Sequence, residues 1–378
     1  RFPKPAHQHA SPGNRMSSQP TPKIYIAGIG MITPVGANTA MTAAAVRAGV
    51  SGYQASRHFN QQSQRITMAG VPEELFSSMQ VEIDEGNGYS EQYDHIIKMA
   101  ILALREALSG QSIKKPVPLI LTIPEELPGI TYIKPEALIK NLTRQKDLPL
   151  HADLVRCLCN GRAAGIQGLE LAAHYLNHQK ADFVLLGGSD SHCAALRIEE
   201  LDKQGRLLAP ASKDGFAPGE GAGFLLLTRH PEKALVRDHH IVALNQPGVS
   251  QEPGHLYSSE TYRGDGLDQA FKQALNGYTG NAIRSIYSSM NGEHHWAKEH
   301  GVAFIRNQAS FHDPVRIEHP ADCYGDLGSA TGPVLIGLAA ESLLMKHPGP
   351  ATHLVYSSSD GPARAVVRVE KISRTAST

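Results

Sequence analysis

Cysteine, long apolar runs and excess charge are scarce or missing in this sequence, and each shortage excludes a class of protein. The four cysteines form neither a CxxC pair nor a disulfide framework, which favours a reducing compartment such as the cytoplasm. No apolar run is long enough to span a bilayer, and the N-terminal segment lacks the apolar core of a signal peptide. Lysine and arginine total 36, as do aspartate and glutamate, so no charge excess favours nucleic acid or a membrane surface.

Complete cofactor and metal motifs are also missing. Gly28 and Gly30 begin a dinucleotide-binding pattern, but Thr33 stands where the third glycine of GxGxxG is needed. Residues 293–300 contain three histidines, His294, His295 and His300, yet they match neither HExxH nor HxxEH. We therefore expect a solvated helix face there, and we predict neither a bound cofactor nor a metal ion.

Two further groups of histidine and cysteine are separated in the chain. His192 and Cys193 could meet residues 319–323, which hold His319 and Cys323, only through tertiary contact. Cys157 and Cys159 lie two apart on an expected strand, so their side chains should point to opposite faces. None of these pairs predicts a metal site or a disulfide by itself.

The chain is long enough for two halves with ample core. Residues 1–22 are polar and rich in proline, serine, histidine and glutamine, which predicts a disordered extension, and Met16 could be the natural start. No low-complexity linker divides the remainder. We expect an N-terminal half at 23–245 and a C-terminal half at 246–378.

The stretch at 154–190 organises the chain. An apolar run ending at Leu158 predicts a buried strand, and small residues at 160–165 predict a turn. Apolar residues at helical spacing predict a helix up to about residue 176, followed by a strand at 183–186 and a tight turn at Gly187 and Gly188. The first turn aims its residues at a helix N-terminus, where partial positive charge favours a thiolate or an oxyanion.

Strands and helices alternate through the rest of the sequence. The pattern predicts strands at 23–30, 66–69, 118–123, 224–227, 239–244, 286–290, 354–357 and 365–369. It predicts helices at 39–48, 93–108, 135–142, 265–275 and 327–345, with a short helix within 189–201. This alternation over two comparable halves predicts an α/β protein.

Three segments make the sequence similar to the β-ketoacyl synthases, the condensing enzymes of the thiolase fold. They are the GIG…TPVG segment at 28–36, the ADFVLLGG strand at 181–188 and the DGFAPGEGAG segment at 214–223. The resemblance covers most of residues 23–371. It implies a thiolase fold with duplicated α/β halves in a five-layered α/β/α/β/α arrangement. The glycine-rich third segment suggests close backbone approach, turns with positive φ and a buried carboxylate that ties loops together.

The same resemblance places the family's Cys-His-His machinery on residues of other types. Counting back from the strand at 181–188 puts Arg162 in place of the nucleophilic cysteine. Asn291 stands in place of the first histidine and Asp326 in place of the second, while residues 359–364 replace the glycine-rich gating loop. An amide cannot exchange a proton near neutral pH, and an ionised Asp326 would repel a malonyl carboxylate. We therefore assign no catalytic residue to these three positions.

A buried ion pair is the simplest arrangement for these replacements. Arg162 would be costly to bury alone beside a helix N-terminus, so we predict that Asp326 holds it. Cys159 is the fallback nucleophile if the turn is longer than in the family, although a buried core cysteine is the favoured interpretation. Asp360 and Arg364 are expected to form a loop ion pair.

Three functional hypotheses follow. The first is a non-condensing, chain-length-factor-like partner in fatty-acid or polyketide-type biosynthesis, as a homodimer or as a heterodimer with an active ketosynthase, with an acyl carrier protein as a further partner. The second is an acyltransferase or hydrolase that uses Cys159 or Asp326. The third is a scaffold or regulatory protein, because fold alone does not fix function. The sequence leaves enzymatic activity, the acyl substrate and the pathway open.

Overall fold

A computed structural model describes residues 23–84, 92–129, 134–179, 181–346 and 351–374. The helices are α1 (Thr39–Arg47), α2 (Gln92–Leu108), α3 (Pro135–Arg144), α4 (Ala164–Asn177), α5 (Ala195–Lys203), α6 (Asp265–Leu275), α7 (His294–Arg306), α8 (Ala321–Tyr324) and α9 (Thr331–Leu343). The strands are β1 (Ile24–Ile32), β2 (Gln54–Phe59), β3 (Arg65–Met68), β4 (Leu119–Thr122), β5 (Val155–Leu158), β6 (Val184–Ser191), β7 (Glu220–Thr228), β8 (His240–Leu244), β9 (Gly248–Gln251), β10 (Ile283–Ser288), β11 (Phe311–Glu318), β12 (Thr352–Ser358) and β13 (Ala363–Ser373). Across these residues, no helix is both long and apolar enough to cross a membrane. The predicted disordered extension at 1–22 lies outside the described residues.

The main sheet consists of two similar sets of strands. The first set has the order β5-β4-β6-β7-β1, and the second has the order β11-β10-β12-β13-β8. Each set begins with two parallel pairs and ends with two antiparallel pairs. β1 pairs with β8 through Ile24 with Leu244 and Tyr25 with Ala243, which joins the two sets. The predicted duplication of α/β halves is therefore present.

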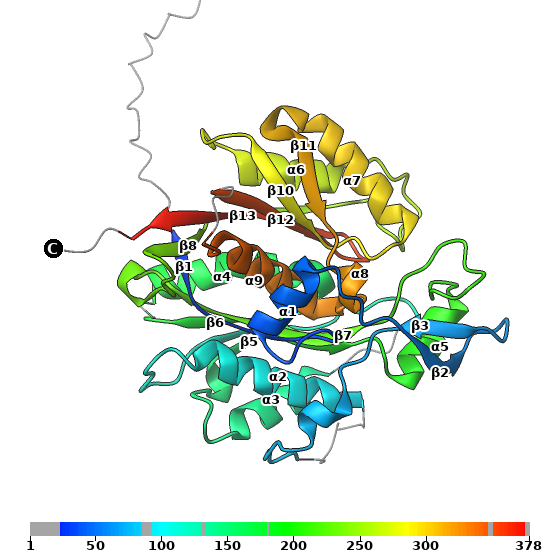
Figure 1. Cartoon of the computed structure of the whole chain (residues 1–378), viewed down its shortest axis with the longest axis horizontal. Helices are drawn as coiled ribbons and strands as arrows, with labels where there is room; N and C mark the ends of the chain where they lie inside the picture. The colour runs from blue at the N-terminus through cyan, green and yellow to red at the C-terminus, as the bar shows by residue number, and fades with distance from the viewer. Residues whose placement is uncertain (1–22, 85–91, 130–133, 180, 347–350, 375–378) are drawn as a thin grey trace, which may run out of the picture.

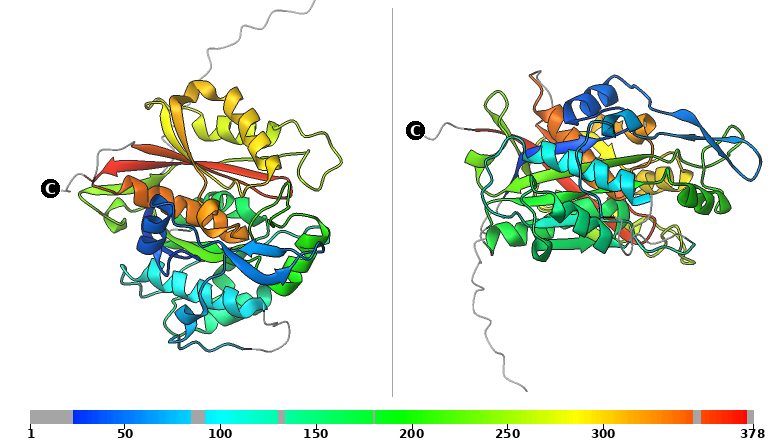
Figure 2. Two further views of the ribbon diagram at one scale, coloured as in Figure 1. Left: turned by 45° about the vertical axis from the view of Figure 1, so that its right-hand side comes forward. Right: turned by 90° about the horizontal axis from the view of Figure 1, so that it is seen from below.

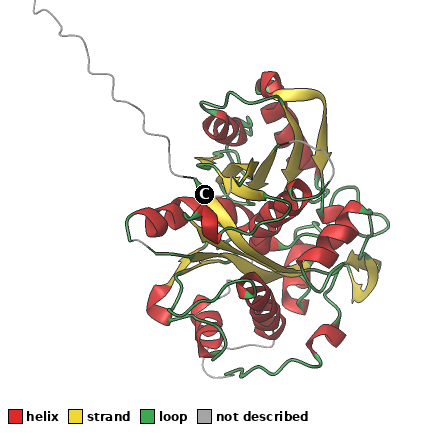
Figure 3. Cartoon of the chain, turned by 60° about the vertical axis from the view of Figure 1, so that its left-hand side comes forward, coloured by secondary structure: helices red, strands yellow, loops and turns green. Residues whose placement is uncertain are grey.

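Helices form three layers around the two sets of strands. α4 and α9 lie between the sets, α2 and α3 cover the outer face of the first, and α6 and α7 cover the outer face of the second (Figures 1 and 3). Separate clusters of buried apolar side chains fill the central layer and the two outer layers. This arrangement confirms the predicted five-layered α/β/α/β/α fold.

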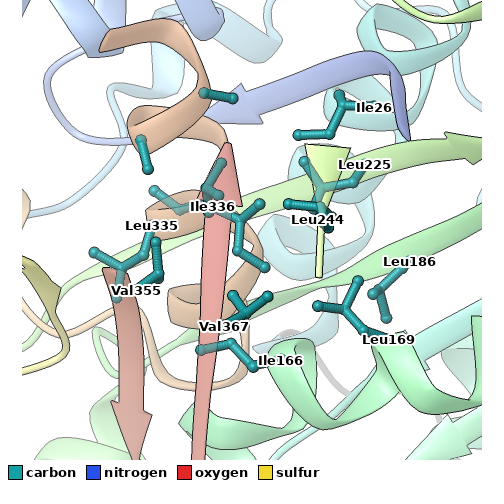
Figure 4. Packing of buried hydrophobic residues seen from close by; sticks show 14 of the residues in the cluster. Ile26, Ile166, Leu169, Leu186, Leu225, Leu244, Leu335, Ile336, Val355 and Val367 are labelled. Carbon is teal, nitrogen blue, oxygen red and sulfur yellow. The ribbon is translucent and has the colours of Figure 1, made fainter. Parts of the chain in front are cut away.

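The central layer explains the composition of α9. Twelve of its 13 residues are buried, with Ser342 as the exception, because sheet or helix surrounds it on all sides. A helix that is apolar around its whole circumference is stable only in such a position. Side chains from both helices and both sets of strands interdigitate here (Figure 4). Examples are Ile166, Leu169, Leu186, Leu225, Leu335, Ile336, Val355 and Val367.

The glycines after residue 186 form no turn, so that prediction is wrong. β6 continues through Gly187 and Gly188 to Ser191. A Cβ at Gly187 would lie 2.1 Å from the Gly223 carbonyl oxygen, and one at Gly188 would lie 2.1 Å from Thr122 Oγ1. These glycines are therefore required by close packing within the sheet, a requirement that sequence pattern does not distinguish from a turn.

The last part of the glycine-rich segment at 214–223 is a β-strand, which was not predicted. β7 already begins at Glu220 and includes Gly221 and Gly223. A Cβ at Gly223 would lie 2.6 Å from the side chain of Val334 on α9, so close approach is a real requirement here. None of the glycines of this segment has a positive φ, which contradicts the predicted left-handed turns.

Other boundaries differ in smaller ways. The helix predicted at 327–345 starts with a 3-10 turn at Gly328–Ala330, and α9 begins only at Thr331. β2, β9 and β11 were not predicted, and β11 lies at a sheet edge with a polar sequence that lacks an apolar pattern. If the halves are defined by the strand repeat, β8 belongs to the second half. The predicted boundary at 245/246 would place β8 in the first half, and that boundary stays a prediction.

Candidate functional site

The turn between β5 and α4 places Arg162 inside the molecule. Gly161 has a φ of 53°, a left-handed conformation that favours glycine, and it opens a 3-10 turn at Gly161–Ala163. The Ser359 hydroxyl donates to the Asn160 carbonyl and accepts from the Ala163 N–H at 2.9 Å. The turn is thereby attached to the C-terminal loop, and the side chain of Arg162 is only 6% exposed.

Arg162 has a partner for each part of its guanidinium. One terminal nitrogen contacts Asp326 and the other contacts Asp360, while Nε donates to the Ser358 carbonyl at 2.9 Å. The guanidinium carbon lies 4.6 Å from the centre of the Trp296 ring, which adds a cation–π contact. The predicted pair of Arg162 with Asp326 is therefore confirmed, and Asp360 is a second acceptor that the sequence did not reveal.

Asn291 joins the same cluster. Its amide nitrogen donates to Asp326 at 2.8 Å and to Glu293 at 3.1 Å. Asp326 also accepts the N–H of Gly328 at 2.9 Å. The structure thus brings together Arg162, Asn291 and Asp326, which lie in the segments that follow β5, β10 and α8.

A second arginine, Arg206, completes the cluster. It donates to Glu293 through two nitrogens, each at 2.8 Å, and to Asp360 at 2.6 Å. Asp360 is therefore shared by Arg162 and Arg206, and we call these two arginines with Asp326, Asp360, Glu293 and Asn291 the arginine cluster. No sequence signal marks Arg206, because it belongs to no motif and its carboxylate partners lie at least 87 positions away.

The predicted ion pair of Asp360 with Arg364 is wrong. Arg364 is fully buried and donates to Glu299 at 2.6 Å and to the carbonyls of Ser359, Gly361 and Ala363. Its role is to hold the backbone of the C-terminal loop from within. Asp360 can then point to the other side of that loop, towards Arg162 and Arg206.

The helix with three histidines is also more buried than predicted. In α7, His294 is exposed, but Trp296, Glu299 and His300 are buried, and His300 stacks on Tyr356 with ring centres 5.5 Å apart. The α7 face is therefore a packing surface, with Trp296 Nε1 donating to Glu293 at 3.0 Å. Among the described residues, no group of histidine, cysteine and carboxylate side chains is arranged to hold a metal ion, and this includes the residues at 192–193 and 319–323.

Charges within the arginine cluster keep Asp326 and Asp360 ionised. Burial alone would raise the pKa of Asp326, but Arg162, His192 and the hydrogen bond from Asn291 hold that pKa below its usual value. Burial opposes ionisation of Asp360 as well, and Arg162 and Arg206 nevertheless lower its pKa strongly. Burial lowers the pKa of His192, whose Nε2 lies 3.8 Å from Asp326. Neither Asp326 nor Asp360 is therefore a carboxylic acid that could donate a proton near neutral pH.

Open space beside the arginine cluster lies on the side of Arg206 and Glu293, which line part of a cavity of about 670 Å³. On the side of Asn291 and Asp326, little space remains. A cavity of about 10 Å³ is lined in part by Ser288, Asn291, Tyr324, Asp326 and Thr331. That volume accommodates about one water molecule. The cluster holds three carboxylates and two guanidinium groups, and each side chain is hydrogen-bonded to another member, so none is free to act as a nucleophile.

Cys159, the fallback nucleophile, is exposed and follows the end of β5. The favoured interpretation of a buried core cysteine is therefore wrong for this residue. β5 ends at Leu158, one residue before Cys159, so the Cys159 side chain lies at the surface. Cys159 belongs to a different environment from Arg162, although only three positions separate them.

Comparisons with known proteins agree with this architecture. The family model of the β-ketoacyl synthase N-terminal domain matches residues 161–233. No curated protein matches the chain in sequence. Among solved structures, the ishigamide ketosynthase/chain length factor superposes with a TM-score of 0.70 at 18% identity, covering 93% of this chain and 99% of that chain.

Two further structures give similar values. A ketosynthase (ApeO) in complex with its chain length factor (ApeC) from Xenorhabdus doucetiae has a TM-score of 0.69 at 16% identity, covering 94% of this chain and 100% of that chain. The module 6 ketosynthase of the bacillaene synthase from Bacillus subtilis 168 has a TM-score of 0.71 at 14% identity, covering 92% and 72%. The chain therefore has the thiolase fold of the ketosynthases, and its residues 161–233 carry the sequence pattern of their N-terminal domain.

Proposed function

We propose that this protein is a non-condensing, chain-length-factor-like partner of a ketosynthase. Two of the similar structures are named as a ketosynthase with its chain length factor. A decarboxylating condensation needs a thiolate to carry the acyl group and two imidazoles to act on the malonyl group. In this interpretation Arg162, Asn291 and Asp326 occupy the three places, and none of them can replace the group that the chemistry needs.

The observation that carries the proposal is the complete pairing of Arg162. Its guanidinium contacts two carboxylates, one carbonyl and one aromatic ring. Because a buried, paired arginine is held by charge from several segments, it cannot move aside without stranding Asp326. The place where an acyl nucleophile would act is therefore filled by a structural ion pair.

The sheet offers an edge for a partner. β5 lies at the end of the strand order and, within the described part of the chain, pairs with β4 alone. An unpaired edge strand is an aggregation hazard, so natural proteins usually cover it. We propose a two-fold dimer through this edge, either with a second copy or, preferably, with a catalytically complete ketosynthase. An acyl carrier protein would then be a partner of the pair, and the pathway would be of fatty-acid or polyketide type.

Two measurements test this proposal together. The purified chain, supplied with acyl and malonyl carrier proteins, should form no condensation product. The same chain, co-expressed with a ketosynthase encoded beside it, should co-purify as a stoichiometric pair. Robust condensation by the chain alone would overturn the proposal, and so would a chain that stays monomeric at micromolar concentration in the presence of that ketosynthase.

The exposure of Cys159 favours one alternative, an acyl-transferring or hydrolysing enzyme that uses this thiol. Turnover of an acyl thioester that disappears in Cys159→Ser would support it. Asp326 is a weaker candidate, because its lowered pKa and its pairing remove it from general acid chemistry. If neither a partner nor turnover is found, a scaffold or regulatory role becomes the better interpretation.

A further inference from the structure

A further cavity lies away from the arginine cluster and shares none of its residues. It has a volume of about 450 Å³ and is lined in part by Met68, His95, Ser191, Ala194, Leu196 and Glu220. These residues come from β3, α2, the end of β6, the start of α5 and the start of β7. Figures 1 and 2 show β3 and α5 together at one side of the molecule, and buried side chains of the two elements share a small apolar cluster. We call this cavity the His95 pocket.

The floor of the His95 pocket is a buried carboxylate whose interactions are complete. Glu220 accepts the N–H of Val71 at 2.8 Å and the hydroxyl of Ser191 at 2.7 Å. His95 Nδ1 lies 3.2 Å from the same carboxylate. Because Glu220 is only 4% exposed, these contacts fix the imidazole ring at the pocket wall. This confirms that a carboxylate of the glycine-rich segment ties loops together.

The other nitrogen of His95 has a replaceable partner. Nε2 contacts Glu73, whose side chain is 71% exposed. An exposed ion pair contributes little to stability, so another carboxylate could take the place of Glu73 at small cost. The hydrogen bond to Glu220, together with the charges of both carboxylates, raises the pKa of His95 to about 9 against the effect of burial. The ring is therefore an imidazolium at neutral pH.

The start of α5 adds a further preference for an anion. Its N-cap residue is Ala194, which offers no side-chain acceptor, and its first turn contains no acidic residue. The N-terminus of a helix carries partial positive charge, which here is not offset by a cap. Met68 and Leu196 supply apolar wall, and Leu196 is 46% exposed. A pocket of this size with mostly apolar walls and a few polar groups is typical of small-molecule sites.

We propose that the His95 pocket binds an organic carboxylate with a short apolar chain. The carboxylate of the ligand replaces Glu73 on His95 Nε2, and its chain packs against Met68 and Leu196. This binding is separate from the proposed partner function, because it uses neither the arginine cluster nor the β5 edge.

Isothermal titration of the full chain with hexanoate tests the proposal. We expect hexanoate to bind, 1-hexanol to bind at least about tenfold more weakly because it lacks the charge, and acetate to bind more weakly because it lacks the chain. Glu73→Gln should tighten hexanoate binding, since it removes the competing carboxylate. If the role of Glu73 were purely structural, Glu73→Gln would not increase the affinity for hexanoate. Failure of hexanoate to bind, or equal binding of hexanol, would overturn the proposal.

Two variants place the carboxylate within the pocket. His95→Gln removes the imidazolium and should weaken hexanoate binding at least about tenfold. Ala194→Asp caps α5 and puts the protein's own carboxylate at the anion position, so it should abolish binding while preserving the fold. The matched control is Ala297→Asp, which adds the same charge at an exposed position of α7 and should leave binding unchanged. Undiminished binding to Ala194→Asp would exclude the proposed position.

Discussion

Arg162 and Asp360 form a buried ion pair although 198 positions separate them in the chain. Asp360 also pairs with Arg206, and Arg162 also pairs with Asp326. Charge thus connects the turn before α4, the segment after α5, the segment after α8 and the C-terminal loop. Because each arginine has two carboxylate partners, the loss of one residue should have different consequences at different points of the arginine cluster.

Replacing Arg162 should therefore cost more stability than replacing Asp326. Arg162→Met strands Asp326, which is 1% exposed, and we expect a loss of about 3–5 kcal/mol. Asp326→Leu leaves Arg162 with Asp360 and should cost less. The double variant should lose less than the sum of the two single losses, because it removes both members of the pair. Urea unfolding of the four proteins measures this coupling.

An exposed arginine provides the control for that cycle. Arg57→Met changes a side chain on the β2 surface and should change the free energy of unfolding by less than about 0.5 kcal/mol. Additive, mild losses in the Arg162 and Asp326 variants would contradict the account of a buried pair. An equal loss in Arg57→Met would show that removal of any arginine charge has this effect.

The cysteines should differ sharply in reactivity. Cys159 is exposed, whereas burial raises the pKa of Cys157 to about 11 and raises the pKa of the Cys193 thiol well above its usual value. Cys323 is buried as well. Because the thiolate is the reactive form, a disulfide reagent at pH 8 should modify one thiol rapidly and the others slowly. Cys159→Ser should abolish the fast phase, while Cys193→Ser should preserve it; a fast phase that survives in Cys159→Ser would contradict the structure.

Much of this arrangement could be predicted from sequence, because apolar periodicity and ordered motifs report local structure. The helix at 265–275 and the pairing of Arg162 with Asp326 are examples in which pattern and physical need agree. Arg206 and Asp360 were missed because their pairing depends on tertiary geometry that no local pattern encodes. Gly187 and Gly188 were misassigned because a glycine required by close packing resembles a glycine required by a turn.

The close packing at Gly188 leads to a further prediction. A Cβ there would lie 2.1 Å from Thr122 Oγ1 and 2.5 Å from the Thr122 carbonyl oxygen. Gly188→Ala should therefore force apart β6 and β4 and destabilise the protein by about 1–3 kcal/mol. Gly110→Ala is the control, because no described atom lies within 4 Å of its added Cβ. Thermal unfolding would contradict this account if the two variants had the same midpoint.

Glu125 should give the protein a pH-dependent stability near neutrality. Its carboxylate accepts the N–H of Gly361 at 3.1 Å and faces Asp360 and Arg162. Burial, aided by the negative charge of Asp360 and opposed by Arg162, raises its pKa to about 7 from the usual 4.5. Between these two values the unfolded chain has released the proton while the folded chain still holds it.

The stabilising effect of that retained proton is present below about pH 4.5 and is lost as the pH rises through about 7. The loss attributable to Glu125 should be on the order of 2–3 kcal/mol between pH 5 and pH 8. Glu125→Gln remains uncharged throughout, so the difference in unfolding free energy between it and the wild type should change with pH across this window. Glu126→Gln, an exposed neighbour, should show a constant difference. Denaturant unfolding at several pH values makes the comparison, and parallel curves for wild type and Glu125→Gln would show that Glu125 does not titrate in this range.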